Sequence, residues 1–396
     1  MRSLQLFVPA LSAAILLSAC STGNATNPLS TTPNVQTHLA RGAVISNVPK
    51  QFLYVANYGS DNVSAYSINT TSGALSAVTG SPFTAGTQPA GIAIAPANNF
   101  IYTANEDSNN ISGYSINVSS GALTALSGSP FGAGGEPFGI AINKTGKFLY
   151  VANYYGGNIS AYTINPSTGN LTQISGSPFG SEQLPDGIAV TPNGRYLYVS
   201  NGGNSGGSVS GYKINPSSGA LAQVAGSPFT AGGYNDALTI DSRSKFVYTT
   251  DLVGGVDSFS IGAGGTLTAI PGSPFGAGTD PWAVSVSKND IFAFAANYGS
   301  DNVSAYTVTA ANGVLTAVPG SPFGAGTSPR GVVEDNRGKF AYVANYGSNN
   351  VSAYKINPSS GALTAVTGSP FGAGTNAFAL ATCRVATLTT CKPPKL

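Results

Sequence analysis

One position of an internal repeat carries side chains that could do chemistry. The repeat recurs every 46–50 residues, and in each copy the position lies two residues before an apolar run of the Ile-Ala-Ile type. Its occupants are Ala90, Phe138, Asp186, Asp236, Trp282 and Arg330, with Arg41 or Phe378 in the seventh copy. Because the neighbouring positions stay nearly constant while this one varies, its residues are candidates for a specific task.

The chemical types at this position fit a small-molecule site. Asp186 and Asp236 could act as a general base or accept hydrogen bonds from sugar hydroxyls. Arg330 could hold an anion or polarise a carbonyl group, and Trp282 could stack on a ring. With Phe138 they combine apolar walls and a few convergent polar groups. We take the two Asp and the Arg as candidate catalytic residues and all five as candidate ligand-binding residues. The alternative is that they only plug a channel and pair with one another.

A second repeat position supplies one more candidate. It follows the Asn that ends another apolar run, and its occupants are Tyr58, Glu106, Tyr154, Gly202, Leu252, Tyr298 and Tyr346. Tyr recurs here through repetition, so we expect it to be structural. Glu106 departs from that pattern, as does the adjacent Asp107. We therefore add Glu106 to the predicted ligand-binding residues.

The repeat that positions these residues is typical of a β-propeller. Gly-Ser-Pro-Phe occurs seven times, with its Ser at positions 81, 129, 177, 227, 273, 321 and 369. Each copy holds four short runs rich in Val, Ile, Tyr, Phe and Thr, bounded by Gly, Asn, Pro and Ser, and none has helical periodicity. A period of this length indicates stacked repeats. We predict an all-β fold, a seven-bladed β-propeller with four antiparallel strands per blade, whose variable position rings one mouth of the channel.

Two segments compete for the last innermost strand. Residues 41–45 and residues 378–381 both align with the innermost strands of the other repeats, which gives eight candidates for seven places. Either the C-terminal segment completes the first blade, or one of the two lies outside the blades as a cap. We favour closure by the C-terminal segment.

The N-terminal residues indicate export. An apolar stretch, Leu4–Leu17, precedes Ser-Ala-Cys and is too short to span a bilayer. Small residues before Cys20 resemble the lipobox of bacterial lipoproteins. We predict a lipoprotein signal peptide over residues 1–19, lipidation of Cys20, and a flexible tether over residues 20–40. The protein would then be a lipid-anchored component of the bacterial cell envelope; an ordinary cleaved signal peptide is the alternative.

The remaining boundaries follow from the repeat and from the cysteines. The propeller is predicted over residues 41–382 and a C-terminal tail over residues 383–396. Cys383 and Cys391 are eight positions apart in an exported chain, so we predict a disulfide that closes a short loop. A redox-active pair is the alternative, although no Cys-x-x-Cys spacing supports it.

Composition restricts the classes of partner. Charged residues make up 8% of the chain and the net charge is +2, which does not support nucleic-acid binding. No metal-binding spacing is present, and we expect a monomer without metal or cofactor. Lysines and arginines gather at the turns between the first and second runs of the repeats. A solvated rim that resists aggregation explains them, and contact with anionic lipid or an envelope polymer is the alternative.

The second run of the repeat resembles a known family. Residues Tyr54–Asn57, Tyr150–Asn153 and Tyr342–Asn345 all read Tyr-Val-Ala-Asn. They look like the Tyr-Val-Thr-Asn repeat of YVTN-type propellers. Over about residues 42–382 the chain is similar to the lactonase family that includes 6-phosphogluconolactonase. That resemblance implies a sugar-lactone hydrolase with a His, a Glu and Arg residues at the channel.

Two functions remain open on these grounds. The chain's single His, His38, lies in the predicted tether, so a catalytic base would have to be Asp186 or Asp236 with a raised pKa. A phosphorylated sugar would also call for more cations than Arg330 and perhaps Arg41. We therefore favour a non-catalytic propeller that binds a carbohydrate or an envelope protein at the channel mouth. The alternative is a lactonase-family hydrolase.

Overall fold

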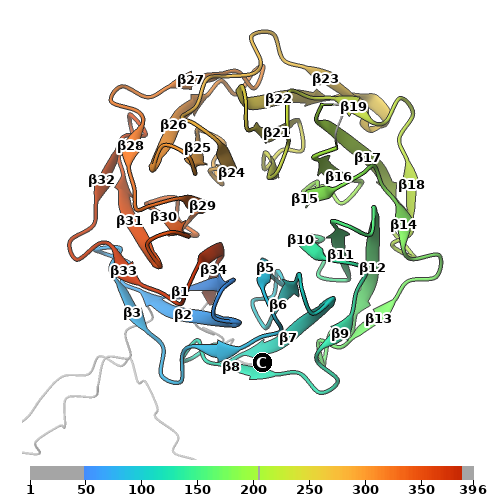
Figure 1. Ribbon diagram of the computed structural model, residues 1–396, viewed down its shortest axis with the longest axis horizontal. Coiled ribbons are helices and arrows are strands. Elements are labelled where there is room, and N and C mark those ends of the chain that lie inside the picture. Colours follow the sequence, from blue (N-terminus) through green and yellow to red (C-terminus); the bar gives the residue numbers. More distant parts are fainter. Residues whose placement is uncertain (1–48, 204–205, 386–396) are drawn as a thin grey trace, which may run out of the picture. The chain divides into compact units, whose positions relative to one another are not determined.

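The computed structural model describes residues 49–203 and 206–385 of the 396-residue chain. These residues form seven antiparallel sheets arranged as blades around a central channel (Figure 1). The predicted all-β, seven-bladed propeller is therefore confirmed. Four strands follow one another from the channel to the rim of each blade. Over this described part of the chain, no helix has the length and hydrophobicity that crossing a membrane would require.

The strands divide among the blades as follows. Blade 1 contains β34 (Ala377–Val385), β1 (Lys50–Asn57), β2 (Asn62–Ile68), β3 (Leu75–Ala77) and β4 (Phe83–Thr84). Blade 2 contains β5 (Pro89–Ile94), β6 (Phe100–Asn105), β7 (Asn110–Ile116), β8 (Leu123–Ala125) and β9 (Phe131–Gly132). Blade 3 contains β10 (Pro137–Ile142), β11 (Phe148–Asn153), β12 (Asn158–Ile164), β13 (Leu171–Gln173) and β14 (Phe179–Gly180). Blade 4 contains β15 (Pro185–Val190), β16 (Tyr196–Asn201), β17 (Ser208–Ile214), β18 (Leu221–Gln223) and β19 (Phe229–Thr230).

The other three blades repeat this plan with one variation. Blade 5 contains β20 (Leu238–Ile240), β21 (Phe246–Asp251), β22 (Gly255–Ile261), the 3-10 turn η1 (Ala263–Gly265) and β23 (Leu267–Ala269). Blade 6 contains β24 (Pro281–Val286), β25 (Phe292–Asn297), β26 (Asn302–Val308), β27 (Leu315–Ala317) and β28 (Phe323–Gly324). Blade 7 contains β29 (Pro329–Glu334), β30 (Phe340–Asn345), β31 (Asn350–Ile356), β32 (Leu363–Ala365) and β33 (Phe371–Gly372).

Every blade has the same two ends. The innermost strands all begin at one end of the channel, which we call the mouth end, and they finish at the opposite end, which we call the far end. Because the strands are antiparallel, the turn between the innermost and second strands lies at the far end, and the turn between the second and third strands lies at the mouth end.

The Gly-Ser-Pro-Phe repeat shapes the outer edge of the blades. In blade 1, both β3 and β4 pair with β2, so Gly-Ser-Pro divides the outer strand into two segments. The Ser81 hydroxyl accepts the backbone N–H of Ala65 at 2.8 Å, which satisfies a strand donor that the interrupted outer strand leaves open. Blade 5 lacks the short outer segment and keeps a single bridge between Val256 and Phe275.

The Tyr of Tyr-Val-Ala-Asn joins neighbouring blades. Its ring is fully buried, and its hydroxyl donates to the carbonyl of a turn glycine in the next blade, as from Tyr54 to Gly121 at 2.9 Å. In blade 7, Tyr342 donates to the carbonyl of Gly73 in blade 1, also at 2.9 Å. Gly73 has a φ of +81°, and a Cβ there would lie 2.3 Å from the Phe340 ring, so only glycine fits this turn.

Tyr342→Phe should lower the free energy of unfolding by about 1–3 kcal/mol, because it leaves the buried Gly73 carbonyl without its donor. Chemical denaturation followed by tryptophan fluorescence would measure the change. Tyr155→Phe is the matched control, since Tyr155 is 71% exposed. Equal effects of the two substitutions would show that this hydrogen bond does not stabilise the closed propeller.

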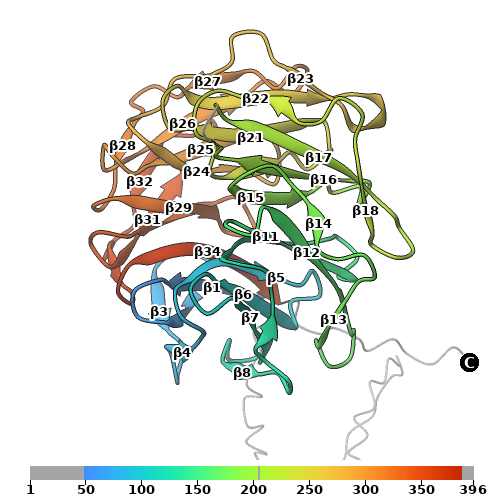
Figure 2. The ribbon, with the colours of Figure 1, turned by 45° about the vertical axis from the view of Figure 1, so that its right-hand side comes forward.

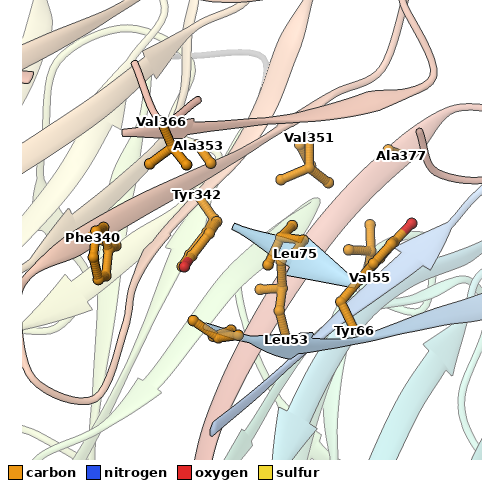
Figure 3. Close-up of a cluster of buried hydrophobic side chains, with 12 residues drawn as sticks. Leu53, Val55, Tyr66, Leu75, Phe340, Tyr342, Val351, Ala353, Val366 and Ala377 are labelled. Atoms are coloured by element: carbon orange, nitrogen blue, oxygen red, sulfur yellow. The ribbon is translucent and has the colours of Figure 1, made fainter. Parts of the chain in front are cut away.

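The C-terminal strand closes the ring, as favoured from the sequence. Strand β34 pairs with β1 along its whole length, and the two lie side by side in Figure 2. Figure 3 shows the core at this closure, where Phe340 and Tyr342 of blade 7 face Leu53 and Val55 of blade 1. The competing segment, residues 41–45, lies outside the described residues.

The predicted boundary between propeller and tail is wrong. Strand β34 does not end at residue 382 but continues to Val385, because Cys383 and Val385 pack into the core with Phe52. Cys383 is fully buried and has no disulfide partner among the described residues, and burial raises the pKa of its thiol to about 12. Its predicted disulfide partner, Cys391, lies outside the described residues, as do the signal peptide, Cys20 and the tether. The disulfide therefore stays a prediction.

One innermost strand ends on an unusual residue. Glu334 stands at the far end of β29, where other blades carry Ile94, Ile142 or Val190. Its side chain is buried, and Oε1 has no hydrogen-bond partner among the described residues. Burial, followed by repulsion from Asp335, raises the pKa of Glu334 to about 8.

Glu334→Gln should stabilise the protein more at pH 8 than at pH 5. The raised pKa means that the folded chain keeps a proton that the unfolded chain releases above its ordinary pKa, so stability is highest in acid and falls as the pH rises toward 8. Because Gln does not titrate, the difference in melting temperature between the variant and wild type should be roughly 5 °C larger at pH 8 than at pH 5. Glu182→Gln, at an exposed position, is the control, and a parallel pH dependence of wild type and Glu334→Gln would contradict the assignment.

Candidate functional site

The variable repeat position does ring the mouth of the channel. A cavity of about 250 Å³ is lined by Ala90, Phe138, Asp186, Asp236, Trp282, Arg330 and Phe378. Phe378 takes the seventh place because β34 is the innermost strand of blade 1. Arg41, the other candidate for that place, lies outside the described residues. The five predicted ligand-binding residues at this position therefore face one cavity.

We call the variable repeat position the ring position. Small residues directly after it make the mouth narrow. A Cβ on Gly139 would lie 2.1 Å from the backbone oxygen of Asp186, and a Cβ on Gly187 would lie 2.5 Å from that of Asp236. The N–H of Gly187 donates to that same Asp236 oxygen at 2.7 Å. Neighbouring innermost strands thus touch through their backbones, which fixes the side chains of the ring relative to one another.

A second cavity of about 360 Å³ shares Asp186, Asp236 and Arg330 with the first. It adds Tyr58, Glu106, Tyr154, Tyr234 and Leu252 to the lining. Glu106 therefore lines the same cavity as the ring residues. Burial raises the pKa of Glu106, while the nearby Tyr58 hydroxyl, which donates to Gln88 at 2.9 Å, lowers it.

Asp186 and Asp236 form a buried carboxyl pair. Their residues are 5% and 3% exposed. Burial and then repulsion from Asp236 raise the pKa of Asp186 well above its usual range, against the lowering effect of Arg330. Burial raises the pKa of Asp236 to about 7, while Arg330 and a hydrogen bond from Asp186 lower it. Asp236 therefore ionises near neutrality, and its charge opposes the ionisation of Asp186.

Arg330 is held by aromatic rings rather than by carboxylates. Its Cζ lies 3.6 Å from the centroid of the Trp282 ring, 4.6 Å from that of Tyr346 and 4.8 Å from that of Phe378. The ion pairs among the described residues involve Arg243 alone. Among the described residues, the buried Nε of Arg330 and the buried Oδ2 of Asp236 have no hydrogen-bond partner. The ring residues therefore form no ion pairs with one another, as the plug alternative would require.

Tyr234 is the site residue that the repeat comparison missed. Its hydroxyl is 2.5 Å from that of Tyr154, and its ring covers Gly202, where a Cβ would lie 2.4 Å from it. Five of the other six copies carry Pro directly before the ring position and the C-terminal one carries Ala377, whereas this one carries Asn235. Asn235 is buried and donates to the Thr250 carbonyl at 2.8 Å, which redirects the loop toward the mouth. The replaced Pro was the signal that could have found Tyr234.

The mouth has two chemically different sides. Blades 4 and 5 supply the carboxyl pair, and blades 6, 7 and 1 supply the guanidinium with its aromatic cage. A group placed between them would meet a carboxylate near neutrality, a proton donor and a fixed positive charge. This combination can activate water, protonate a leaving group and stabilise an oxyanion.

Comparison with solved structures shows the same fold at low sequence identity. A candidate 6-phosphogluconolactonase from Bacteroides fragilis is 21% identical, with a TM-score of 0.74 over 85% of this chain and 99% of the other. A corresponding protein from Bacteroides uniformis is 19% identical, with a TM-score of 0.72 over 84% and 99%. A periplasmic gluconolactonase from Pseudomonas aeruginosa is 20% identical, with a TM-score of 0.70 over 85% and 99%.

A comparison with family models gives a direct sequence match. The family described as "Lactonase, 7-bladed beta-propeller" matches residues 20–138, 131–233, 226–318 and 265–377. No curated protein matches the chain. The matched segments cover most of the sequence and all seven blades of the structure, so this chain belongs to the seven-bladed β-propeller lactonase family.

Proposed function

We propose that this protein hydrolyses a sugar lactone at the channel mouth. The observation that carries the proposal is the buried pair Asp186 and Asp236, which shares a cavity with the unpaired cation Arg330. Family membership and a gluconolactonase of the same fold support this function over the non-catalytic one favoured from the sequence. The missing channel His is no obstacle, because Asp236 has the pKa that a general base needs near neutrality.

The proposed mechanism uses each charged group once. Asp236 takes a proton from water as the water oxygen attacks the lactone carbonyl carbon, and Arg330 stabilises the resulting oxyanion. Collapse of this intermediate breaks the bond between the carbonyl carbon and the ring oxygen. Asp186 gives its proton to that ring oxygen, which leaves as a hydroxyl. The product is the open aldonic acid, which ionises to the aldonate and releases a proton to solvent. Transfer of the proton from Asp236 to Asp186 restores the starting pair.

The charge of the mouth favours a neutral lactone over a phosphorylated one. Arg330 is the one basic residue at the mouth end among the described residues, whereas Glu106, Asp107 and Glu136 lie there as well. A phosphate dianion would meet net repulsion before it reached the guanidinium. The aromatic rings around the cation offer a stacking surface for the apolar face of an uncharged sugar.

Turnover by the purified protein tests the proposal. Acid release from glucono-1,5-lactone and from its 6-phosphate would be followed at pH 6–8, with spontaneous hydrolysis subtracted. We expect turnover of the neutral lactone with a higher kcat/KM than that of the phosphorylated one. Absence of turnover for a panel of five- and six-membered lactones would contradict the enzymatic function.

A carbohydrate-binding function without catalysis is the second candidate. The aromatic cage of Trp282, Tyr298 and Tyr346 favours it, since such surfaces bind sugar rings. Saturable binding of the aldonic acid or of a glycan that is lost in Trp282→Ala, without lactone turnover, would support this candidate instead. Export to the cell envelope and lipidation of Cys20 remain part of the proposal and agree with either function.

A further inference from the structure

The charges of the propeller are segregated between its two ends. Among the described residues, every Lys and Arg except Arg330 lies at or next to the far end, in turns or strand ends of every blade except blade 2. These residues are Lys50, Lys144, Lys147, Arg195, Lys213, Arg243, Lys245, Lys288, Arg337, Lys339, Lys355 and Arg384. All but Arg337, which is half-buried, are exposed. The far end is therefore a broad basic face.

No exposed carboxylate offsets this basic face in the described part of the chain. Its acidic residues, Asp241, Asp290, Glu334 and Asp335, are all buried. Asp241 and Asp290 are paired with Arg243, at 3.3 and 3.1 Å, and burial keeps Glu334 largely protonated. Exposed carboxylates such as Asp61, Glu182 and Asp301 lie at the mouth end. Although the net charge of the chain is small, the protein has a strong charge dipole along its channel.

The described chain both enters and leaves through the basic face. Strand β1 begins at Lys50 and β34 ends at Val385, and both residues lie at the far end. Upstream of Lys50, the sequence carries the apolar stretch Leu4–Leu17 and Cys20. Any membrane attachment through these residues would act on the far end of the propeller.

We propose that the far-end face docks on the anionic phospholipid headgroups of a membrane. The basic residues are spread over the end of a ring rather than along a groove, which suits a plane of charges better than a single polymer strand. Docking in this way directs the channel mouth, with Asp186 and Asp236, away from the lipid surface. The proposal holds whether or not the mouth hydrolyses lactones.

Vesicle binding of the full-length protein tests this face. We would compare its partition onto phosphatidylcholine vesicles with that onto vesicles containing 30% phosphatidylglycerol, because the ratio removes any contribution of the apolar N-terminal stretch. Wild type should prefer the anionic vesicles, and the preference should weaken with rising salt. The triple variant Lys144→Gln, Lys245→Gln, Lys339→Gln should lose on the order of 100-fold of that preference, since each basic residue near an anionic surface contributes roughly fivefold.

A matched variant distinguishes the effect of the far-end basic residues on vesicle binding from the effect of the overall net charge. Thr87→Glu, Thr279→Glu and Thr327→Glu lower the net charge by the same amount at exposed positions of the mouth-end loops, and this triple should keep most of the preference. Equal losses in the two triples, or no preference of wild type for anionic vesicles, would overturn the proposal. Binding to dextran sulfate without binding to anionic vesicles would also overturn it, in favour of an anionic polymer.

Discussion

Replacing Asp236 with Asn is expected to lower kcat for lactone hydrolysis by about 10²–10⁴-fold, the usual contribution of a general base. The amide keeps the size and shape of the carboxyl group but cannot take a proton from water. In wild type, kcat/KM should rise as the pH increases through about 7, because Asp236 must be ionised to act. It should fall again at higher pH, where Asp186 loses the proton that the leaving group needs. Initial rates between pH 5 and 9 would show both limbs.

Folding of the Asn variant provides an internal control. A buried carboxylate whose pKa is raised destabilises the folded state as the pH rises through that pKa, so Asp236→Asn should melt at the same or a higher temperature than wild type at pH 8. Loss of activity together with retained stability would identify a chemical role. Asp186→Asn should remove the high-pH limb of the profile while leaving a measurable rate. An Asp236→Asn variant with wild-type kcat would contradict the proposed mechanism.

Arg330→Gln is expected to lower kcat by about 10²–10³-fold, which is typical for removal of one oxyanion-stabilising donor. The guanidinium lies against Trp282 and has no carboxylate partner, so its charge is available to a developing oxyanion. Arg330→Lys should recover only part of the rate, because a compact ammonium cannot stack on Trp282 with the same planar geometry. Single-turnover and steady-state rates with glucono-1,5-lactone would separate the effect on chemistry from the effect on product release.

A control variant and a pH profile test the role assigned to Arg330. Arg195→Gln removes an exposed cation from the far end and should leave kcat unchanged. Loss of Arg330 should also change the pH profile, because its charge lowers the pKa of both Asp186 and Asp236. The rising limb should therefore move to higher pH in Arg330→Gln. A reduced rate with an unmoved profile would mean that the substitution disturbs the mouth in another way.

The proposed mechanism requires no His at the mouth, and the described residues contain none. A general base that works near neutrality needs a pKa close to the working pH, so that it is partly ionised and can still accept a proton. In this protein, burial raises the pKa of Asp236, and Arg330 and Asp186 limit the rise. In the proposed mechanism, the base therefore depends on its surroundings rather than on its residue type.

The blades could be predicted from the sequence because their determinants are local and repeated. Alternating β-branched and aromatic residues, the Asn that follows Tyr-Val-Ala, and Gly-Ser-Pro at the outer edge act within one blade or between neighbours. Asn57, for example, donates to Asn62 at 2.7 Å and to Ser64 at 2.8 Å. Comparison of the seven copies also identified the ring position, since residues at equivalent positions of a closed propeller must face the same channel.

The chemistry of the ring could not be predicted in this way, because it depends on distances and burial across blades. Asp186 and Arg330 are far apart in sequence and influence one another only after β34 has closed the ring on β1. Tyr234 reaches the mouth through the altered path at Asn235, which the other repeats do not share. The sequence by itself determined seven blades and the position that carries Asp186, Asp236, Trp282 and Arg330. Only the tertiary structure decided that the two carboxyls are buried side by side and that aromatic rings surround the cation, because pKa values and ion pairs depend on desolvation and on separations of a few ångströms.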